Sequence, residues 1–164
     1  MPRLNLFRLL INNDLKKLQA QLNLSNVNLL NNNGCSLLHI AVDNLNQEAV
    51  QLLLKNNANP DIVDMQGNTP LIYAACRFNY PLTKAILEAG ANPNIKGDQG
   101  MTAIRWAITN PSGDENLVNL LLQFGANPEI NNDHNSNALD YAEKVYPDFA
   151  VKLKHFVKSS LDLS

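Results

Sequence analysis

The stretch Gly67-Asn68-Thr69-Pro70-Leu71-Ile72 decides the fold, because the chain repeats it in related forms. The other two forms are Gly34-Cys35-Ser36-Leu37-Leu38-His39 and Gly100-Met101-Thr102-Ala103-Ile104-Arg105, and successive leading glycines are 33 residues apart. A second motif lies between these stretches and reads Asn-Ala-Asn-Pro at 57–60 and Gly-Ala-Asn-Pro at 90–93 and 125–128. A fixed period of about 33 residues is typical of proteins built from stacked structural repeats.

Each repeat is predicted to contain two helices joined by a short break. A hydroxyl residue two positions after the leading glycine is a good N-cap for the first helix, because its oxygen accepts hydrogen bonds from unpaired helix amides. These N-caps are Ser36, Thr69 and Thr102. The second helices carry apolar stripes at helical spacing and are predicted over 47–55, 81–88 and 115–124.

A residue that favours left-handed backbone follows each predicted second helix. Asn57, Gly90 and Gly125 stand at these positions, where helices commonly end. Polar stretches then lead to the next repeat, and their composition and length suit projecting turns or short hairpins. These stretches cover 60–67, 93–100 and 128–135.

The layout of these elements strongly resembles the ankyrin repeat. The resemblance rests on Thr69-Pro70-Leu71 with Ala74-Ala75, on Ser36-Leu37-Leu38-His39 with Ala41, and on the Gly-Ala-Asn stops, and it covers 31–131. It implies an all-α repeat solenoid, an ankyrin-repeat stack of helix-turn-helix units with projecting β-turn or hairpin loops. It also implies that the ring of His39 supports its turn through local hydrogen bonds.

We expect a single ankyrin-repeat domain over 1–164. The pattern decays toward both ends, as a stack requires, because the outer face of a terminal repeat must be polar. The third repeat has two extra residues within 110–115, which are either a tolerated loop insertion or a contact loop. The predicted units are an N-terminal capping repeat at 4–30, repeats at 31–63, 64–96 and 97–131, and a C-terminal capping repeat at 132–158.

Aromatic side chains recur along the predicted stack. Ile40, Tyr73, Trp106 and Tyr141 occupy equivalent positions in successive repeats, and we expect them to contribute to the core. Phe78 stands where the ankyrin repeat usually has glycine. Its ring is either a partly exposed candidate for a binding hot spot or packs against the next repeat.

The composition excludes several classes of function. The chain is 45% hydrophobic and 17% charged, so it should fold, and its net charge of −2 argues against a nucleic-acid-binding surface. Four lysines near the C-terminus are interpreted as the solvated face of the last helix. No apolar run approaches the roughly 20 residues that cross a bilayer. We therefore expect a cytoplasmic protein that binds neither nucleic acid nor membrane.

The sequence contains no pattern for catalysis or metal binding. Cys35 and Cys76 match no disulfide framework or zinc spacing, and His39, His134 and His155 share no metal-ligand spacing. No nucleophile motif or glycine-rich phosphate-binding loop occurs. We expect no enzyme activity, no metal and no cofactor.

The resemblance implies that a partner protein binds along a concave groove made by the projecting turns and the first helices. Four aspartates on this surface, at 43, 64, 98 and 133, favour a partner with a basic patch. We expect an adaptor or inhibitor that is a monomer when unbound. The alternatives are a bacterial effector that acts on a host protein in the host cytosol, or an immunity protein that blocks a cognate toxin. The candidate contact residues are Asn33, Asp43, Asn44, Met65, Gln66, Asn68, Cys76, Arg77, Phe78, Asp98, Gln99, Met101, Thr109, Asn110, Asp133 and His134.

Overall fold

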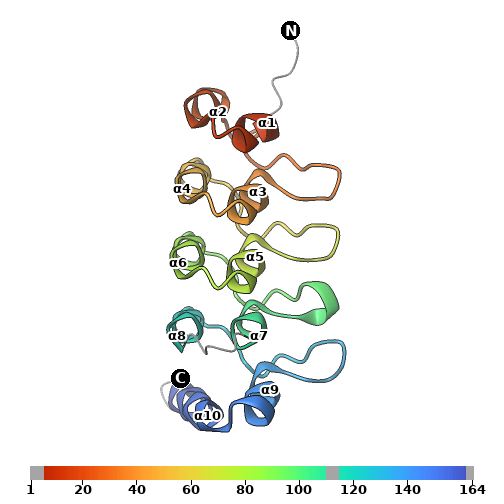
Figure 1. The fold of residues 1–164 in the computed structure, drawn as a ribbon, viewed down its shortest axis with the longest axis vertical. Helices are drawn as coiled ribbons and strands as arrows, with labels where there is room; N and C mark the ends of the chain where they lie inside the picture. Colours follow the sequence, from red (N-terminus) through yellow and green to blue (C-terminus); the bar gives the residue numbers. More distant parts are fainter. Residues whose placement is uncertain (1–5, 110–114, 162–164) are drawn as a thin grey trace.

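The protein is described from a computed structural model that covers residues 6–109 and 115–161, apart from the side chains of residues 156 and 159–161. Within these ranges the helices form five successive pairs stacked in a column (Figure 1). The pairs are α1 (Leu6–Ile11) with α2 (Leu15–Gln21), α3 (Leu37–Asp43) with α4 (Gln47–Lys55), α5 (Pro70–Cys76) with α6 (Tyr80–Glu88), α7 (Ala103–Ala107) with α8 (Glu115–Gln123), and α9 (Ala138–Val145) with α10 (Pro147–Leu161).

The first helices of the pairs form one row of the column and the second helices form another (Figure 1). Helices contact their equivalents in neighbouring pairs, for example α5 with α3 and α7. Long loops project from the row of first helices, away from the second helices (Figure 1). In the described residues these loops contain one isolated β-bridge, between Leu30 and Ser36, and one 3-10 turn, η1 (Asp98–Gly100). The predicted all-α repeat solenoid is confirmed.

Polar side chains fix where the helices begin. Ser36 and Thr69 accept hydrogen bonds from the third amide of α3 and α5, as predicted. Asn79 caps α6 by accepting from the amide of Leu82 at 3.0 Å, so this helix begins at Tyr80, one residue earlier than predicted. The prediction for Thr102 is wrong in one respect: its backbone has the extended N-cap geometry, but its hydroxyl makes no capping hydrogen bond.

Left-handed residues end the second helices and separate the helices of a pair. Asn57, Gly90 and Gly125 all have positive φ, which confirms the predicted stops. Leu45 and Phe78 occupy the breaks between paired helices, each with a φ of 53°. Glycine adopts this conformation without steric cost, whereas a residue with a Cβ does not.

The core runs without interruption between the two rows of helices. Each pair contributes fully buried leucine or isoleucine side chains, such as Leu18, Leu53, Ile86, Leu121 and Leu153. The predicted aromatic ladder is only half-buried, but all four of its side chains pack against this core. A continuous core shared between neighbours means that each repeat depends on the next for its stability.

The Asn-Pro motifs connect successive repeats along one edge of the stack. The backbone amides of Asn59, Asn92 and Asn127 each donate to a side-chain oxygen about 31 to 33 residues earlier. These acceptors are Asn28 at 2.8 Å, Asp61 at 2.9 Å and Asn94 at 2.7 Å. The asparagine of each motif thus links one repeat to the preceding one.

Candidate partner-binding surface

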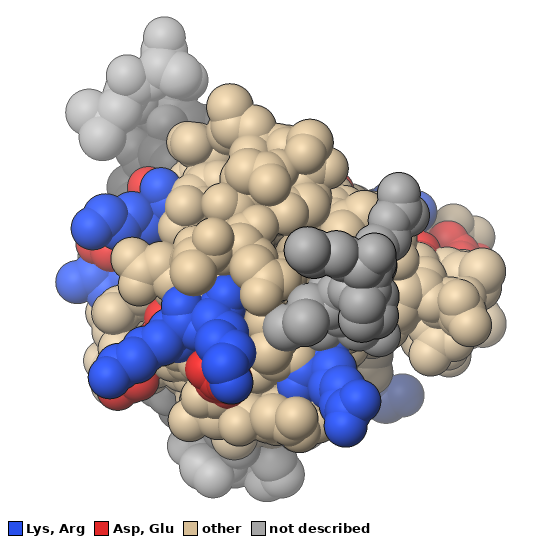
Figure 2. Space-filling model, turned by 90° about the horizontal axis from the view of Figure 1, so that it is seen from above, with Lys and Arg blue, Asp and Glu red and all other residues tan. Residues whose placement is uncertain are grey.

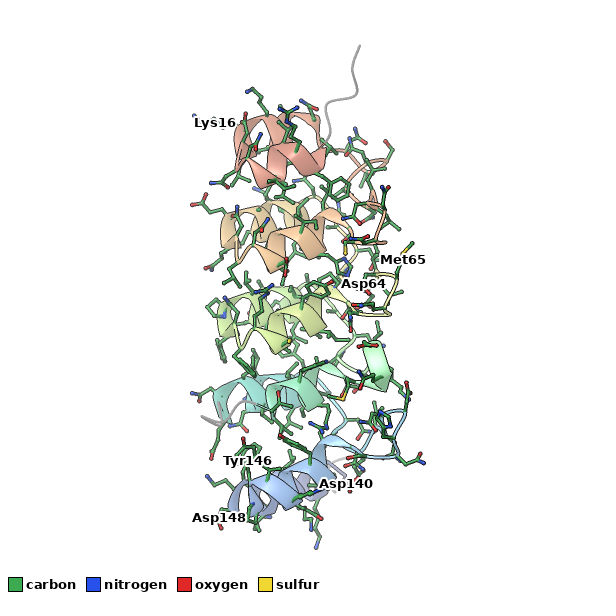
Figure 3. All side chains as sticks on the ribbon, turned by 45° about the vertical axis from the view of Figure 1, so that its right-hand side comes forward. Lys16, Asp64, Met65, Asp140, Tyr146 and Asp148 are labelled. Carbon is green, nitrogen blue, oxygen red and sulfur yellow. The ribbon has the colours of Figure 1, made fainter. Side chains whose placement is uncertain are left out.

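The candidate surface combines the projecting loops with the first helices. We call it the inner strip, and it comprises the loop residues 31–35, 64–68, 97–101 and 132–136 together with α3, α5, α7 and α9. Met65 lies at the outer part of its loop, whereas the neighbouring Asp64 lies nearer to the helices (Figure 3). Met65 is 79% exposed, while Asp64 is buried. The loops therefore separate an exposed tip from a structural base.

One side chain at the base organises each of three loops. Asn31, Asp64 and Asn132 occupy equivalent positions, and the Oδ1 atom of each accepts two backbone amides of its own loop at 2.9–3.0 Å. Neighbouring loops are joined through their backbones. The amide of Met65 donates to the carbonyl of Asn33 at 3.1 Å, and the amide of Asp133 donates to the carbonyl of Gln99 at 3.0 Å. These bonds hold the loop tips in fixed positions.

The third loop is built differently, because Gly97 stands where the other loops have Asn or Asp. The Oδ1 atom of Asn68, from the preceding loop, accepts the amide of Asp98 at 3.0 Å instead. A Cβ atom on Gly97 would collide with Oδ1 of Asn68 and with Cδ1 of Ile72. Asn68 is consequently only 9% exposed, so the expectation that it is an exposed contact residue is wrong.

The other candidate residues differ in exposure. Asn110 lies outside the described residues, as does most of the 110–115 insertion. Four candidates are partly buried: Asp43, Phe78, Met101 and Thr109. Ten are exposed: Asn33, Asn44, Met65, Gln66, Cys76, Arg77, Asp98, Gln99, Asp133 and His134.

Phe78 satisfies both interpretations in part, because its ring is partly exposed and also packs against the core. Met101 and Thr109 make internal hydrogen bonds. The Sδ atom of Met101 accepts from Asn132 at 3.6 Å, and the hydroxyl of Thr109 donates to the carbonyl of Trp106 at 2.6 Å. These three side chains are therefore less available to a partner than Met65 is.

Most of the acidic side chains of the strip are already engaged within the protein. Asp43 forms an ion pair with Arg77, and an oxygen of Asp133 lies 3.6 Å from Nζ of Lys96. Asp64 is buried and accepts a hydrogen bond from the hydroxyl of Tyr73 at 2.8 Å. Asp98 remains exposed. The expected preference for a basic partner therefore loses most of its basis.

The partly buried Tyr73 phenol and the buried Cys35 thiol lie close to the loop bases. Burial, together with the hydrogen bond to Asp64, raises the pKa of the Tyr73 phenol far above its ordinary value. Burial also raises the pKa of the Cys35 thiol, whose sulfur lies 3.9 Å from the Tyr73 hydroxyl. Both groups therefore stay neutral near pH 7 and act as parts of the framework.

His39 holds two successive repeats together. The amide of Ser36 donates to its Nδ1 atom at 3.1 Å, so Nδ1 carries no proton. The Nε2–H group then donates to the carbonyl of Asn68 in the next repeat at 3.0 Å. Burial lowers the pKa of His39, which keeps the ring neutral. The implied structural role of this histidine is confirmed.

Sequence reasoning missed one cation at the inner edge of the strip. The Cζ atom of Arg105 on α7 lies 3.9 Å from the centre of the Tyr141 ring on α9. Its Nε and Nη1 atoms are buried and have no hydrogen-bond partner among the described residues, and the same holds for Nε1 of Trp106. The available signal was positional: Arg105 stands at the repeat position that His39 occupies two repeats earlier.

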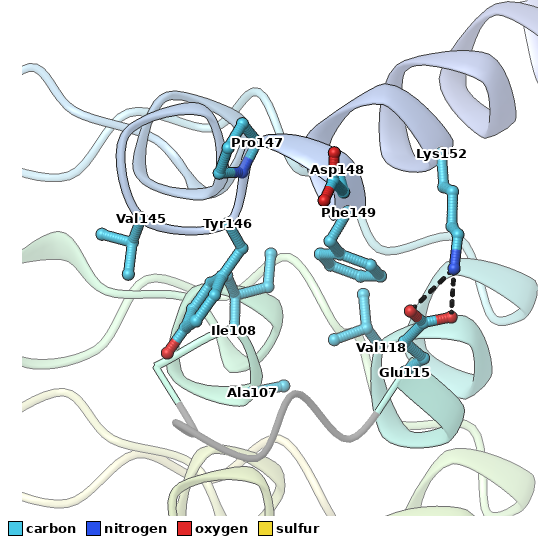
Figure 4. Close-up of a pocket in the computed structure, with 10 residues that line it drawn as sticks. All are labelled: Ala107, Ile108, Glu115, Val118, Val145, Tyr146, Pro147, Asp148, Phe149 and Lys152. Atoms are coloured by element: carbon cyan, nitrogen blue, oxygen red, sulfur yellow. Dashed lines mark hydrogen bonds and ion pairs between the residues drawn. The ribbon is translucent and has the colours of Figure 1, made fainter.

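A cleft of about 420 Å³ lies between the fourth helix pair (α7 and α8) and the last one, and it is open to solvent (Figure 4). Its walls include Ile108, Val118 and Phe149, and the Nζ atom of Lys152 lies 2.9 Å from an oxygen of Glu115 at its rim. Within the described residues, no group of three His, Cys, Asp or Glu side chains is arranged to hold a metal ion. The residues that line the cleft include no paired nucleophile and base.

The basic side chains do not merge into one patch on the end face seen in Figure 2. Lys and Arg lie there in separate groups, with uncharged residues between them and acidic side chains beside some of them. Across the described part of the chain, none of the helices combines the length and the apolar character needed to cross a membrane.

Comparison with known proteins agrees with this architecture. Residues 5–97 match the family profile for ankyrin repeats (3 copies), and residues 99–133 match the profile for a single ankyrin repeat. A segment of 61 residues, 37% of this chain, is 39% identical to receptor-interacting serine/threonine-protein kinase 4 of Mus musculus and covers 8% of that protein. A segment of 38 residues, 23% of this chain, is 53% identical to the ankyrin repeat protein FPV014 of Fowlpox virus (strain NVSL) and covers 9% of it.

The chain thus spans less than a tenth of the length of either relative. The profile matches, in contrast, extend over most of the chain and coincide with the stacked helix pairs. The chain therefore belongs to the ankyrin-repeat family, whose repeats are generally non-catalytic modules for protein–protein interaction.

Proposed function

We propose that this protein binds a partner protein along the inner strip and acts as an adaptor or inhibitor. One observation carries the proposal: the loop tips are exposed and differ between repeats, while the bases of three of the four loops are held by equivalent hydrogen bonds. Met65, Asp98 and His134 are exposed tip residues of three different loops. Asn31, Asp64 and Asn132 hold the bases of three loops in the same way.

Fixed loops favour binding because a partner does not have to order them. Immobilising a flexible, rotamer-rich side chain at an interface costs about 0.5–1.5 kcal/mol, and ordering a loop costs more. The inner strip avoids much of this cost, since its loop backbones are already bonded to one another. The flexible and exposed Met65 can still adapt its side chain to a partner.

Site-specific photocrosslinking tests this placement of the surface. A photoreactive amino acid is introduced at Met65 or at His134, and in control variants at Gln51 or Gln123, which are exposed on the second helices. We expect both strip positions to capture the same discrete protein in cells and the control positions to capture none. Equal capture from both faces, or capture from the second helices alone, would contradict the proposal.

Affinity for the captured protein provides the quantitative test. The combined change of Met65, Arg77 and Met101 to Ala should weaken binding by more than about tenfold. The combined change of Gln51 and Gln123 to Ala should leave the affinity unchanged. Thermal unfolding of both variants controls for loss of structure.

A further inference from the structure

The side chain at one position of the repeat contacts the aromatic ladder residue of the next repeat. The ring of His39 meets the ring of Tyr73 edge-on, with 5.4 Å between their centres. Two repeats further along, Arg105 occupies the position of His39 and lies over the ring of Tyr141 at 3.9 Å. The guanidinium is thus held against an aromatic face, as arginine side chains often are at recognition sites.

The two equivalent residues differ in hydrogen bonding: the ring nitrogens of His39 are bonded, whereas two nitrogens of Arg105 are not, in the part of the chain that the structure describes. Both ring nitrogens of His39 have partners, in Ser36 and Asn68. Nε and Nη1 of Arg105 have none in the described parts of the chain, and no carboxylate there forms an ion pair with it. Burial lowers the pKa of the Arg105 guanidinium, in keeping with a charge that lacks a counter-ion. A partly buried charge without an acceptor is unfavourable until an acceptor arrives.

Among the described residues, Nε1 of the neighbouring Trp106 also lacks an acceptor, and the sequence of the third loop accounts for it. In the second repeat, Asp64 at the loop base accepts the hydroxyl of the ladder residue Tyr73. In the third repeat, the loop base is Gly97 and the ladder residue is Trp106, whose Nε1 is buried without an acceptor among the described residues. Glycine at 97 provides no side-chain oxygen for Trp106, and a larger residue there would require Asn68 and Ile72 to shift.

We propose that this part of the inner strip binds an acidic side chain, Asp or Glu, of the partner protein, with Arg105 as the residue that recognises it. This rests on the proposed function. The side chain of Arg105 is only partly buried, and Nη2 is not among its buried nitrogens, so a carboxylate can approach the guanidinium at this atom. A charge-assisted bond between guanidinium and carboxylate is roughly twice as strong as a neutral one.

The surrounding charges favour a singly charged ligand. Asp98 is exposed on the third loop and Asp140 is exposed on α9 beside Tyr141 in the sequence, while the exposed Asp133 is paired with Lys96. A phosphate group, with a charge of about −1.5 to −2, is repelled by these carboxylates more strongly than a carboxylate is. The proposed occupant is therefore a carboxylate and not a phosphorylated residue.

The test uses a blocked tripeptide, N-acetyl-Gly-Glu-Gly-amide, and its neutral counterpart N-acetyl-Gly-Gln-Gly-amide. The full chain is followed by NMR through the Nε–H signal of Arg105, one of four arginines, and the indole signal of Trp106, the single tryptophan. The Glu peptide should cause a saturable shift of the Arg105 signal, and the Gln peptide should not. The changes Arg105→Lys and Arg105→Gln identify the Arg105 signal by its loss.

Variants then assign the effect to Arg105. With Trp106 as the probe, Arg105→Gln should abolish the response to the Glu peptide, and Arg105→Lys, which keeps the charge but not the planar fork, should weaken it. Arg8→Gln, at an exposed arginine on α1, should leave it unchanged. Thermal unfolding establishes that the variants are folded. If Arg105→Gln does not fold, the Arg105→Lys result and the wild-type comparison of the two peptides decide.

Three results would overturn the inference: no shift with the Glu peptide, equal shifts with both peptides, or a shift with inorganic phosphate that the Glu peptide does not produce. A crosslinked partner that binds Arg105→Gln with unchanged affinity would also overturn it, while leaving the proposed function in place. Loss of strip-specific crosslinking would contradict the proposed function, and the peptide titration would still decide the chemistry of Arg105.

Discussion

Asp43 on α3 and Arg77, the residue directly after α5, form an ion pair that joins two successive repeats across the inner strip. Both side chains are more than two-fifths exposed. Exposed ion pairs contribute little to stability, because solvent screens the attraction and two long side chains lose freedom. The main effect of the pair is therefore on the charge of the partner-binding surface, where Asp43 and Arg77 neutralise each other.

A double-mutant cycle tests this interpretation of the ion pair. We expect Asp43→Asn and Arg77→Gln to show a coupling energy below about 1 kcal/mol in urea unfolding. The coupling should shrink further near 1 M salt, where the Debye length is about 3 Å. A coupling well above this range, or one that salt leaves unchanged, would show that the pair is a structural support.

Asp64 is expected to be one of the most sensitive positions in the loops. Its carboxylate accepts the amides of Gln66 and Asn68 and the hydroxyl of Tyr73. Asp64→Ala leaves these donors unpaired and should lower the free energy of unfolding by about 2 kcal/mol or more. Asp64→Asn is the matched control and should cost much less, since asparagine holds the same position at Asn31 and Asn132. Equal losses in urea unfolding would show that the charge matters more than the acceptor geometry.

His39 makes stability depend on pH in a defined direction. Burial lowers its pKa in the folded protein below the ordinary value of about 6.5, so the unfolded chain binds the proton more readily. Its contribution is complete above pH 6.5 and is lost as the pH falls from there toward the folded pKa. The change His39→Ile should remove this pH-dependent contribution. Isoleucine is chosen because Ile72 occupies the equivalent position of the next repeat. The unfolding free energy of the wild type minus that of His39→Ile should decrease as the pH falls from about 7 to 5. Parallel curves of unfolding free energy against pH would contradict the assignment.

The left-handed breaks should respond differently to glycine. Leu45 is 51% exposed with a φ of 53°, so Leu45→Gly relieves backbone strain and gives up little packing. We expect a gain of about 1 kcal/mol in unfolding free energy. Phe78 has the same φ but packs against the core, so Phe78→Gly should gain less or lose stability. A larger gain at Phe78 than at Leu45 would mean that its ring contributes no packing.

The sequence was sufficient for the helices and their order, because short-range signals define them. Helix α4 spans the predicted 47–55, and the left-handed stops lie where Asn57, Gly90 and Gly125 were expected. The small errors at other helix ends have local causes, such as the cap that Asn79 gives to α6.

The sequence was less informative about which variable positions are exposed. Cys35, Asn68, Met101 and Ser136 occupy one variable position of the repeat, yet all are buried or partly buried. This position lies directly before the N-cap of the first helix. Variation there reflects different internal partners, such as the bond from Asn68 to the third loop.

Arg105 could not be identified as unusual from its own surroundings in the sequence. Its environment is set by the ring of Tyr141, about one repeat later in the chain. A linear pattern shows neither the contact with the ring nor the missing acceptor. Such features depend on which side chains the stacking brings together, and they required the three-dimensional structure.

The hydrogen bonds between loops restrict which partners the inner strip can bind. The amide of Met65 is tied to Asn33, Asp98 to Asn68, and Asp133 to Gln99. The second, third and fourth loops are thus each bonded to the loop before them, so the distances between neighbouring loop tips are fixed. A partner whose contact residues are spaced differently cannot be accommodated by moving one loop alone, so the strip selects by the distance between contacts as well as by their chemistry.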